Sequence, residues 1–130
     1  CVIQVVADGG IRTSGDIVKA FVGGADAVMI GRLLAGVEET PGDINGGMKA
    51  YRGMSSASTR QRIGSTALAE GVDAEVPWGG NAVDRVRNLV AGVKSGMSYA
   101  GAQELKELQR VRWLQQTPHG TIEGTPHILK

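Results

Sequence analysis

The sequence contains little that would indicate a secreted or membrane-bound protein. It has a single cysteine, Cys1, among 130 residues, and one cysteine cannot form an internal disulfide. No uninterrupted apolar run approaches the roughly 18 residues that a membrane-spanning helix needs. These absences exclude a disulfide-stabilised scaffold and a membrane span, and we expect a cytoplasmic protein that does not contact a membrane.

Charge of one sign is not concentrated anywhere in the chain. Lys and Arg together number 14 and Asp and Glu 13, and neither sign forms a block. A protein that binds nucleic acid or a membrane surface normally has an excess of basic residues, so the composition supports neither partner. Aromatic residues make up only 4% of the chain, but 42% hydrophobic and 21% charged residues are typical of a globular domain rather than a disordered one.

Glycine is abundant, with 20 residues, and it marks the ends of the first predicted elements. Residues 2–7 form a β-branched run typical of a buried parallel strand. A helix is expected to begin at Thr13 or Ser14 and to end at Gly23 and Gly24. Residues 25–30 form a second buried strand, so residues 2–31 predict a strand–helix–strand unit with a right-handed crossover.

The pattern becomes irregular and rich in Gly and Ser from residue 37 to residue 80. Two short strands are predicted there, at 48–52 and 74–78. Because a structureless loop of forty residues is unusual in a compact domain, we interpret 37–80 as an inserted flap.

Two closing helices are predicted in residues 81–117. Asn81 caps an amphipathic helix, and a second helix is expected over 103–110. The tail, 118–130, has no periodicity. The apolar face of the first helix comprises Val83, Val86, Leu89, Val90, Val93 and Met97.

The fold class expected from this order is α/β. Two parallel strands alone leave open edges on both sides, whereas more strands of the same kind would close them, as in a barrel. We therefore predict one domain, 1–130, that is the C-terminal part of a TIM (β/α)₈ barrel and is incomplete as given, with the last two strands and the phosphate loops in 1–36.

The ends of the two strands predict a phosphate site. Asp8-Gly9-Gly10 follows the first strand and Gly31 the second, and parallel α/β folds bind ligands at these carboxyl ends. Glycine lets backbone N–H groups approach phosphate oxygens, and an adjacent Asp accepts the hydroxyls of a ribose. A simple strand-ending turn is the alternative interpretation. Arg12 and Asp16 are interpreted as a solvated pair at a helix start, without chemistry.

Residues 5–40 resemble the end of the barrel of the IMP dehydrogenase and GMP reductase family. FMN-dependent barrels that oxidise 2-hydroxy acids carry a similar Asp-Gly-Gly-x-Arg and a similar Gly-Arg. Later motifs separate the two families, because they match the purine-nucleotide enzymes in order and spacing. These motifs are Tyr51-Arg52-Gly53-Met54-Ser55-Ser56, Glu70-Gly71-Val72 with Val76-Pro77, and residues 92–102.

The resemblance implies roles for individual residues. Asp8 would bind the ribose, and the turn Gly9-Gly10, Gly31 and the backbone of Arg32 would bind the 5′-phosphate of GMP or IMP with Tyr51. The remaining implied groups are Gly53, Met54 and Ser55 beside the purine, Glu70 and Gly71 at its Watson–Crick edge, and Glu123, Gly124 and Thr125 at a K⁺ site.

No catalytic residue is expected in this chain. The family's nucleophilic cysteine lies in a Gly-Ser-x-Cys context on a loop after an earlier strand. Cys1 precedes the strand that leads to Asp8 and has no such context. We interpret it as a strand residue and place the nucleophile upstream.

The flap favours one of the family's two reactions. The family's dehydrogenases carry a long flap with an adjacent Arg-Tyr pair, whereas residues 57–69 form a short segment with Arg60 and Arg62 but no tyrosine. We therefore expect GMP reductase activity with NADPH, in a homotetramer by resemblance. NAD-dependent IMP dehydrogenase is the alternative, because residues 11–14 are more dehydrogenase-like, and a non-catalytic nucleotide-binding fragment is a third reading.

Overall fold

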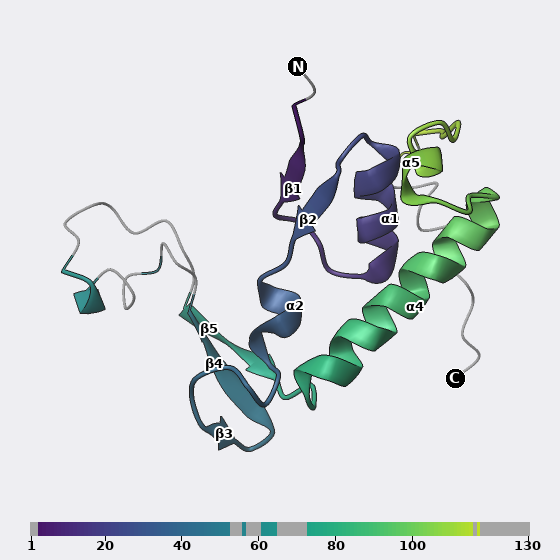
Figure 1. Cartoon of the computed structure of the whole chain (residues 1–130). Coiled ribbons are helices and arrows are strands. Elements are labelled where there is room, and N and C mark those ends of the chain that lie inside the picture. The colour runs from purple at the N-terminus through teal and green to yellow at the C-terminus, as the bar shows by residue number, and fades with distance from the viewer. Residues whose placement is uncertain (1–2, 53–55, 57–60, 65–72, 116, 118–130) are drawn as a thin grey trace.

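The computed structural model describes residues 3–52, 56, 61–64, 73–115 and 117 (Figure 1). Its first unit is the predicted strand–helix–strand: β1 (Val6–Asp8), α1 (Ser14–Val22) and β2 (Ala27–Met29). β1 and β2 are parallel neighbours. Both strands are shorter than the sequence predicts, but their order and the helix between them are confirmed.

A capping box fixes the beginning of α1. The Thr13 side chain accepts a hydrogen bond from the Asp16 amide, and the Asp16 carboxylate accepts the Thr13 amide at 2.9 Å. Partial desolvation raises the pKa of Asp16, but hydrogen bonds from Thr13 and Arg12 and the nearby Lys19 charge lower it below its ordinary value. Asp16 is therefore a helix-capping residue.

The flap region contains a three-stranded antiparallel sheet in the order β3 (Ile44–Asn45), β4 (Met48–Arg52) and β5 (Asp73–Pro77). β4 has the predicted bounds and β5 begins and ends one residue earlier than predicted. Two short elements were not predicted: β3 and the four-residue helix α2 (Arg32–Ala35). This sheet lies at the far end of α2 from the β1–β2 pair (Figure 1).

The two closing helices are confirmed as α4 (Ala82–Ala100) and α5 (Leu105–Leu108), the second shorter than predicted. Asn81 caps α4 as expected, with its side chain accepting the amide of Asp84. The Glu39 carboxylate also accepts the Ala82 amide, at 2.8 Å. Within the described residues, no helix is both long and apolar enough to cross a membrane.

The core lies between α1, α4 and α5, where Ile17, Phe21 and Leu108 are buried. α4 crosses α1 diagonally (Figure 1), and two glycines permit the close approach. A β-carbon at Gly92 would clash with the Ser14 side chain, and one at Gly96 would lie 2.7 Å from a methyl group of Val18.

The β1–β2 pair and the residues that lead into it expose apolar side chains. Ile3, Val5, Val6 and Met29 are all more than half exposed. A parallel sheet is normally covered on both faces, so the described residues form a partial α/β unit.

Candidate functional site

Two loops meet at one edge of the parallel sheet. Asp8, the last residue of β1, pairs with Met29, the last residue of β2. The turn at Gly9 and Gly10 and the loop that leads to Gly31 therefore leave the sheet side by side. This juxtaposition is the arrangement that the sequence predicts for its ligand-binding loops.

The turn after β1 requires glycine and faces open space. Gly9 and Gly10 have φ values of 93° and 75°, a left-handed conformation that other residues rarely adopt. Apart from the adjoining residues, no heavy atom of the described part of the chain lies within 4 Å of the position that a β-carbon would take at either glycine. The backbone of this turn is thus open to a ligand.

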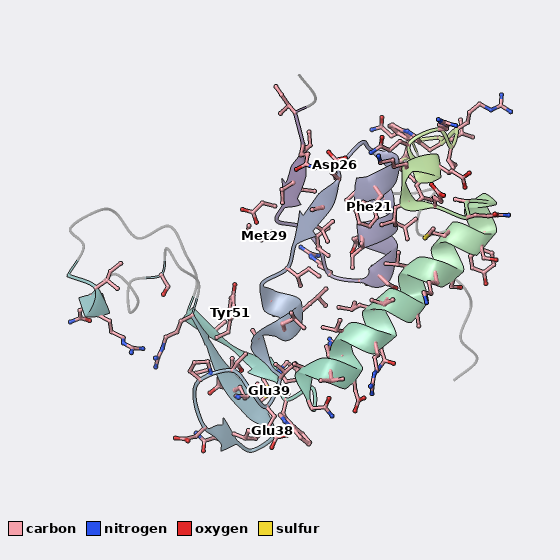
Figure 2. The ribbon with its side chains drawn as sticks, viewed as in Figure 1. Phe21, Asp26, Met29, Glu38, Glu39 and Tyr51 are labelled. Atoms are coloured by element: carbon pink, nitrogen blue, oxygen red, sulfur yellow. The ribbon has the colours of Figure 1, made fainter. Side chains whose placement is uncertain are left out.

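The loop after β2 brings Gly31 close to Tyr51, a residue 20 positions later in the sequence. Gly31 precedes α2 and makes no side-chain cap, and the first amides of a helix have no intrahelical acceptor. The Tyr51 hydroxyl lies 3.8 Å from the position of a β-carbon on Gly31. Figure 2 shows Tyr51 on β4 beside α2. The Tyr51 hydroxyl thus lies beside the Gly31 backbone, and backbone amides at a helix start are suited to binding phosphate oxygens.

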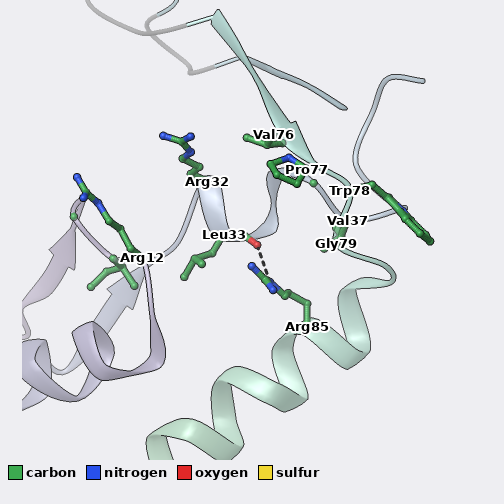
Figure 3. A pocket seen from close by; sticks show the side chains of 12 residues that line it. Arg12, Arg32, Leu33, Val37, Val76, Pro77, Trp78, Gly79 and Arg85 are labelled. Atoms are coloured by element: carbon green, nitrogen blue, oxygen red, sulfur yellow. Dashed lines mark hydrogen bonds between the residues drawn. The ribbon is translucent and has the colours of Figure 1, made fainter. Parts of the chain in front are cut away.

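A pocket of about 720 Å³ lies beside these loops and is rich in arginine (Figure 3). Arg85 is held in place by a hydrogen bond of 3.3 Å from its Nε to the Leu33 carbonyl. Among the described residues, the only salt bridges are Lys19–Asp16 and Arg87–Asp84, so none of them involves an arginine of the pocket. Such a pocket favours an anion. Its lining includes Gly10, Arg12, Arg32, Leu33, Trp78 and Arg85.

Arg12 is the residue whose location the sequence reading missed. We expected a solvated pair with Asp16, but the structure has no Arg12–Asp16 ion pair. Instead, Asp16 accepts the backbone amide of Arg12 at 3.1 Å, and the Arg12 side chain lines the pocket with Arg32. Its position two residues after Gly10 was the available signal, because a side chain there extends from the same loop.

The structure thus brings several of the predicted residues together. Gly10 and Arg32 line one pocket, Gly31 and Tyr51 lie close to each other, and Asp8 lies on the strand end that precedes them. In the described part of the chain, no group of three or more His, Cys, Asp or Glu residues could hold a metal ion. The remaining predicted residues lie outside the described residues: Gly53, Met54, Ser55, Glu70, Gly71, Glu123, Gly124 and Thr125.

Comparison with known proteins shows which protein family the chain matches. Residues 1–127 match the family model for the IMP dehydrogenase / GMP reductase domain. The chain is 44% identical to the inosine-5′-monophosphate dehydrogenase of Thermoplasma acidophilum and 45% identical to that of Aquifex aeolicus. Each alignment covers 98% of this chain and 29% of the relative. The first runs over 141 positions, more than the 130 residues of this chain, so that relative carries extra residues within the matched region.

A solved structure shows the same fold. The crystal structure of the GMP reductase C318A variant from Trypanosoma brucei in complex with guanosine 5′-monophosphate matches with a TM-score of 0.85 and 41% identity. The match covers 98% of this chain and 28% of that one. The expected fold, a part of this family's barrel, is therefore confirmed, and the chain spans less than a third of the length of the relatives it matches.

Proposed function

The chain belongs to the IMP dehydrogenase / GMP reductase family, and from this membership we propose that it supplies the nucleotide-phosphate site of a purine nucleotide oxidoreductase. In this proposal the amides of Gly10, Gly31 and Arg32 and the hydroxyl of Tyr51 bind the 5′-phosphate. Asp8, at the end of β1, accepts hydrogen bonds from the ribose hydroxyls.

The observation that carries the proposal is the proximity of Gly31 and Tyr51. The two residues are 20 positions apart in the sequence, so the fold is what brings the Tyr51 hydroxyl beside the Gly31 backbone. The neighbouring arginines add positive charge, and charge-assisted hydrogen bonds to phosphate are stronger than neutral ones. A dianionic ligand is therefore favoured over a neutral one at this rim.

In this proposal the purine lies beyond the phosphate and contacts residues of the flap. By family resemblance, Gly53, Met54 and Ser55 line the base, and Glu70 and Gly71 meet its Watson–Crick edge. A carboxylate suits that edge because guanine and hypoxanthine both present an N1–H donor.

We propose reductive deamination of GMP as the reaction. GMP, NADPH and two protons give IMP, NADP⁺ and an ammonium ion, through a cysteine nucleophile that lies outside this chain. The nicotinamide cofactor supplies the hydride, and the contact to its 2′-phosphate is expected to be made largely by residues outside the chain. The short segment at 57–69 supports this choice, since deamination needs no activated water. The extra residues that the dehydrogenase relative carries in the matched region are consistent with a shorter flap here.

IMP dehydrogenase activity is the second candidate. In that reaction IMP, NAD⁺ and water give XMP, NADH and a proton. The names and 44–45% identity of two curated relatives favour it, as does the dehydrogenase-like segment 11–14.

The two reactions are separated by steady-state assays of the complete enzyme. We expect NADPH oxidation and ammonia release with GMP, and no NAD⁺ reduction with IMP. Rapid NAD⁺ reduction with IMP would reverse the assignment. Calorimetry on the 130-residue chain alone tests the third reading, because GMP binding without turnover would identify a nucleotide-binding fragment. The homotetramer and the K⁺ site at 123–125 stay predictions.

A further inference from the structure

Lys49 is a buried lysine without a nearby acidic partner among the described residues. Its relative exposure is 1%. The ammonium group donates three hydrogen bonds, to the carbonyl oxygens of Val37 at 2.9 Å, Glu38 at 3.2 Å and Thr40 at 2.7 Å. All three ammonium donors are thereby used. A buried charge is costly unless such partners hold it, so the position of Lys49 relative to this turn is strongly fixed.

Lys49 and Tyr51 lie on the same face of β4, because residues two apart in a strand share a face. They contact opposite ends of the segment that contains α2. Tyr51 reaches Gly31, immediately before the helix, and Lys49 binds the turn at 37–40, immediately after it. In Figure 2 Tyr51 lies beside α2, whereas Glu38 and Glu39 lie at the base of the sheet.

The turn that accepts Lys49 is itself closed and anchored. The Thr40 hydroxyl is within hydrogen-bonding distance of the Ala35 and Val37 carbonyls, at 2.8 and 2.7 Å, which ties the turn back to α2. The Glu38 amide donates to the Gly80 carbonyl at 2.9 Å. The turn is therefore a rigid support, and Lys49 connects β4 to it.

We propose that Lys49 is a positioning residue for phosphate binding, which sets the register of β4 against α2 and so holds the Tyr51 hydroxyl at Gly31. Lys49 does not contact the nucleotide, since its donors are all bound to the turn. This inference rests on the proposed phosphate site. Loss of the ammonium group releases one end of the α2 segment from β4 and moves the hydroxyl away from the phosphate, while the base and ribose contacts are unaffected.

The test compares GMP with guanosine, which differ only in the phosphate, by calorimetry on the complete enzyme. We expect Lys49→Met to lower the ratio of the two affinities about tenfold, which corresponds to about 1.4 kcal/mol. Lys49→Gln keeps an amide donor and should lower it less, and it serves as the readout if Lys49→Met does not fold. Lys94→Met, at an exposed position on α4, is the matched control and should leave the ratio unchanged. Equal loss of GMP and guanosine affinity in the Lys49 variants would indicate a merely structural role and overturn the inference.

A double-variant cycle with Tyr51→Phe tests whether Lys49 acts through Tyr51. Residues that act through a shared contact are non-additive, so the double variant should lose about as much as Tyr51→Phe alone. If the fold-loss of the double variant equals the product of the two single fold-losses, Lys49 does not act through Tyr51 and the inference is contradicted. If Tyr51→Phe itself leaves the GMP-to-guanosine ratio unchanged, the phosphate site fails. If Tyr51→Phe lowers it and the Lys49 variants do not, only the role of Lys49 fails.

Discussion

The Tyr51 hydroxyl oxygen lies 3.8 Å from the place that a β-carbon on Gly31 would occupy. That separation is an ordinary van der Waals contact, and Gly31 has a φ of −113°, outside the left-handed region. Neither the contact nor the backbone therefore requires glycine at position 31. In the proposed site the absent side chain leaves room for a phosphate to approach the Gly31 amide.

Gly31→Ala should fold normally but bind GMP poorly. The added methyl group would occupy space that the phosphate needs, so we expect a loss of about tenfold in GMP affinity, or about 1.4 kcal/mol. Calorimetry and thermal unfolding on the same preparation check both parts. An alanine variant with unchanged GMP affinity would remove the Gly31 amide from the site.

Asp8→Ala should weaken nucleotide binding through the ribose. Hydrogen bonds to charged groups contribute about 1.5–3 kcal/mol, and we expect a loss in that range for GMP. A 2′,3′-dideoxy analogue should lose little further affinity in the variant. Asp43→Ala, at an exposed position in the flap, is the control. Equal sensitivity of GMP and the dideoxy analogue to Asp8→Ala would place the carboxylate elsewhere.

Gly96→Ala should destabilise the protein, although the substitution usually strengthens a helix. At an exposed helical position, Gly→Ala is favourable by up to about 1 kcal/mol. At Gly96 the new β-carbon would lie 2.7 Å from Val18, and overpacking costs about 1–3 kcal/mol. Urea unfolding gives the sign of the change. The neighbouring Ser95→Ala, on the exposed side of α4, should be neutral or slightly stabilising, and a stabilising Gly96→Ala would show that α1 and α4 are not in close contact.

The capping box of α1 predicts an acid-sensitive contribution to stability. The pKa of Asp16 is lowered in the folded protein despite its desolvation, because Thr13 and the Arg12 amide donate to the carboxylate. The contribution of Asp16 to the free energy of unfolding is therefore present above the unfolded pKa of about 3.9. It is lost as the pH falls through the lower pKa of the folded state.

Asp16→Asn should flatten the pH dependence of unfolding below about pH 4, and Thr13→Ala should cost about 1 kcal/mol at neutral pH. Denaturant titrations at pH 7 and pH 3 measure both changes. A Thr13→Ala variant as stable as the parent at pH 7 would show that the box does not hold the helix.

The sequence predicts the elements that have strong periodicity or clear end signals. Helix α1 follows from Thr13 and Gly23, and helix α4 follows from Asn81 and its apolar face, because caps and 3.6-residue spacing are local properties. Helix α2 and strand β3 have four and two residues, which is too short for a period to be visible. Their positions depend on contacts with β4.

The residues of the site also divide into those that the sequence predicts and those that it does not. The sequence predicts the glycines at the strand ends, because close approach of a ligand to the backbone favours glycine. The structure places Gly10 and Gly31 in adjacent loops. The burial of Lys49 could not be predicted, since a lysine at an alternating strand position is normally solvated. Its partners are backbone carbonyls, which have no signature in the side-chain sequence.

The most direct test of the proposed site is a crystal structure of the complete enzyme with GMP. The measurement is the distance from the phosphate oxygens to the Gly31 amide nitrogen and to the Tyr51 hydroxyl. We predict about 2.7–3.2 Å for both, the ordinary hydrogen-bond range, with the ribose at Asp8. A phosphate bound away from both groups, with Tyr51 pointing to solvent, would contradict the account.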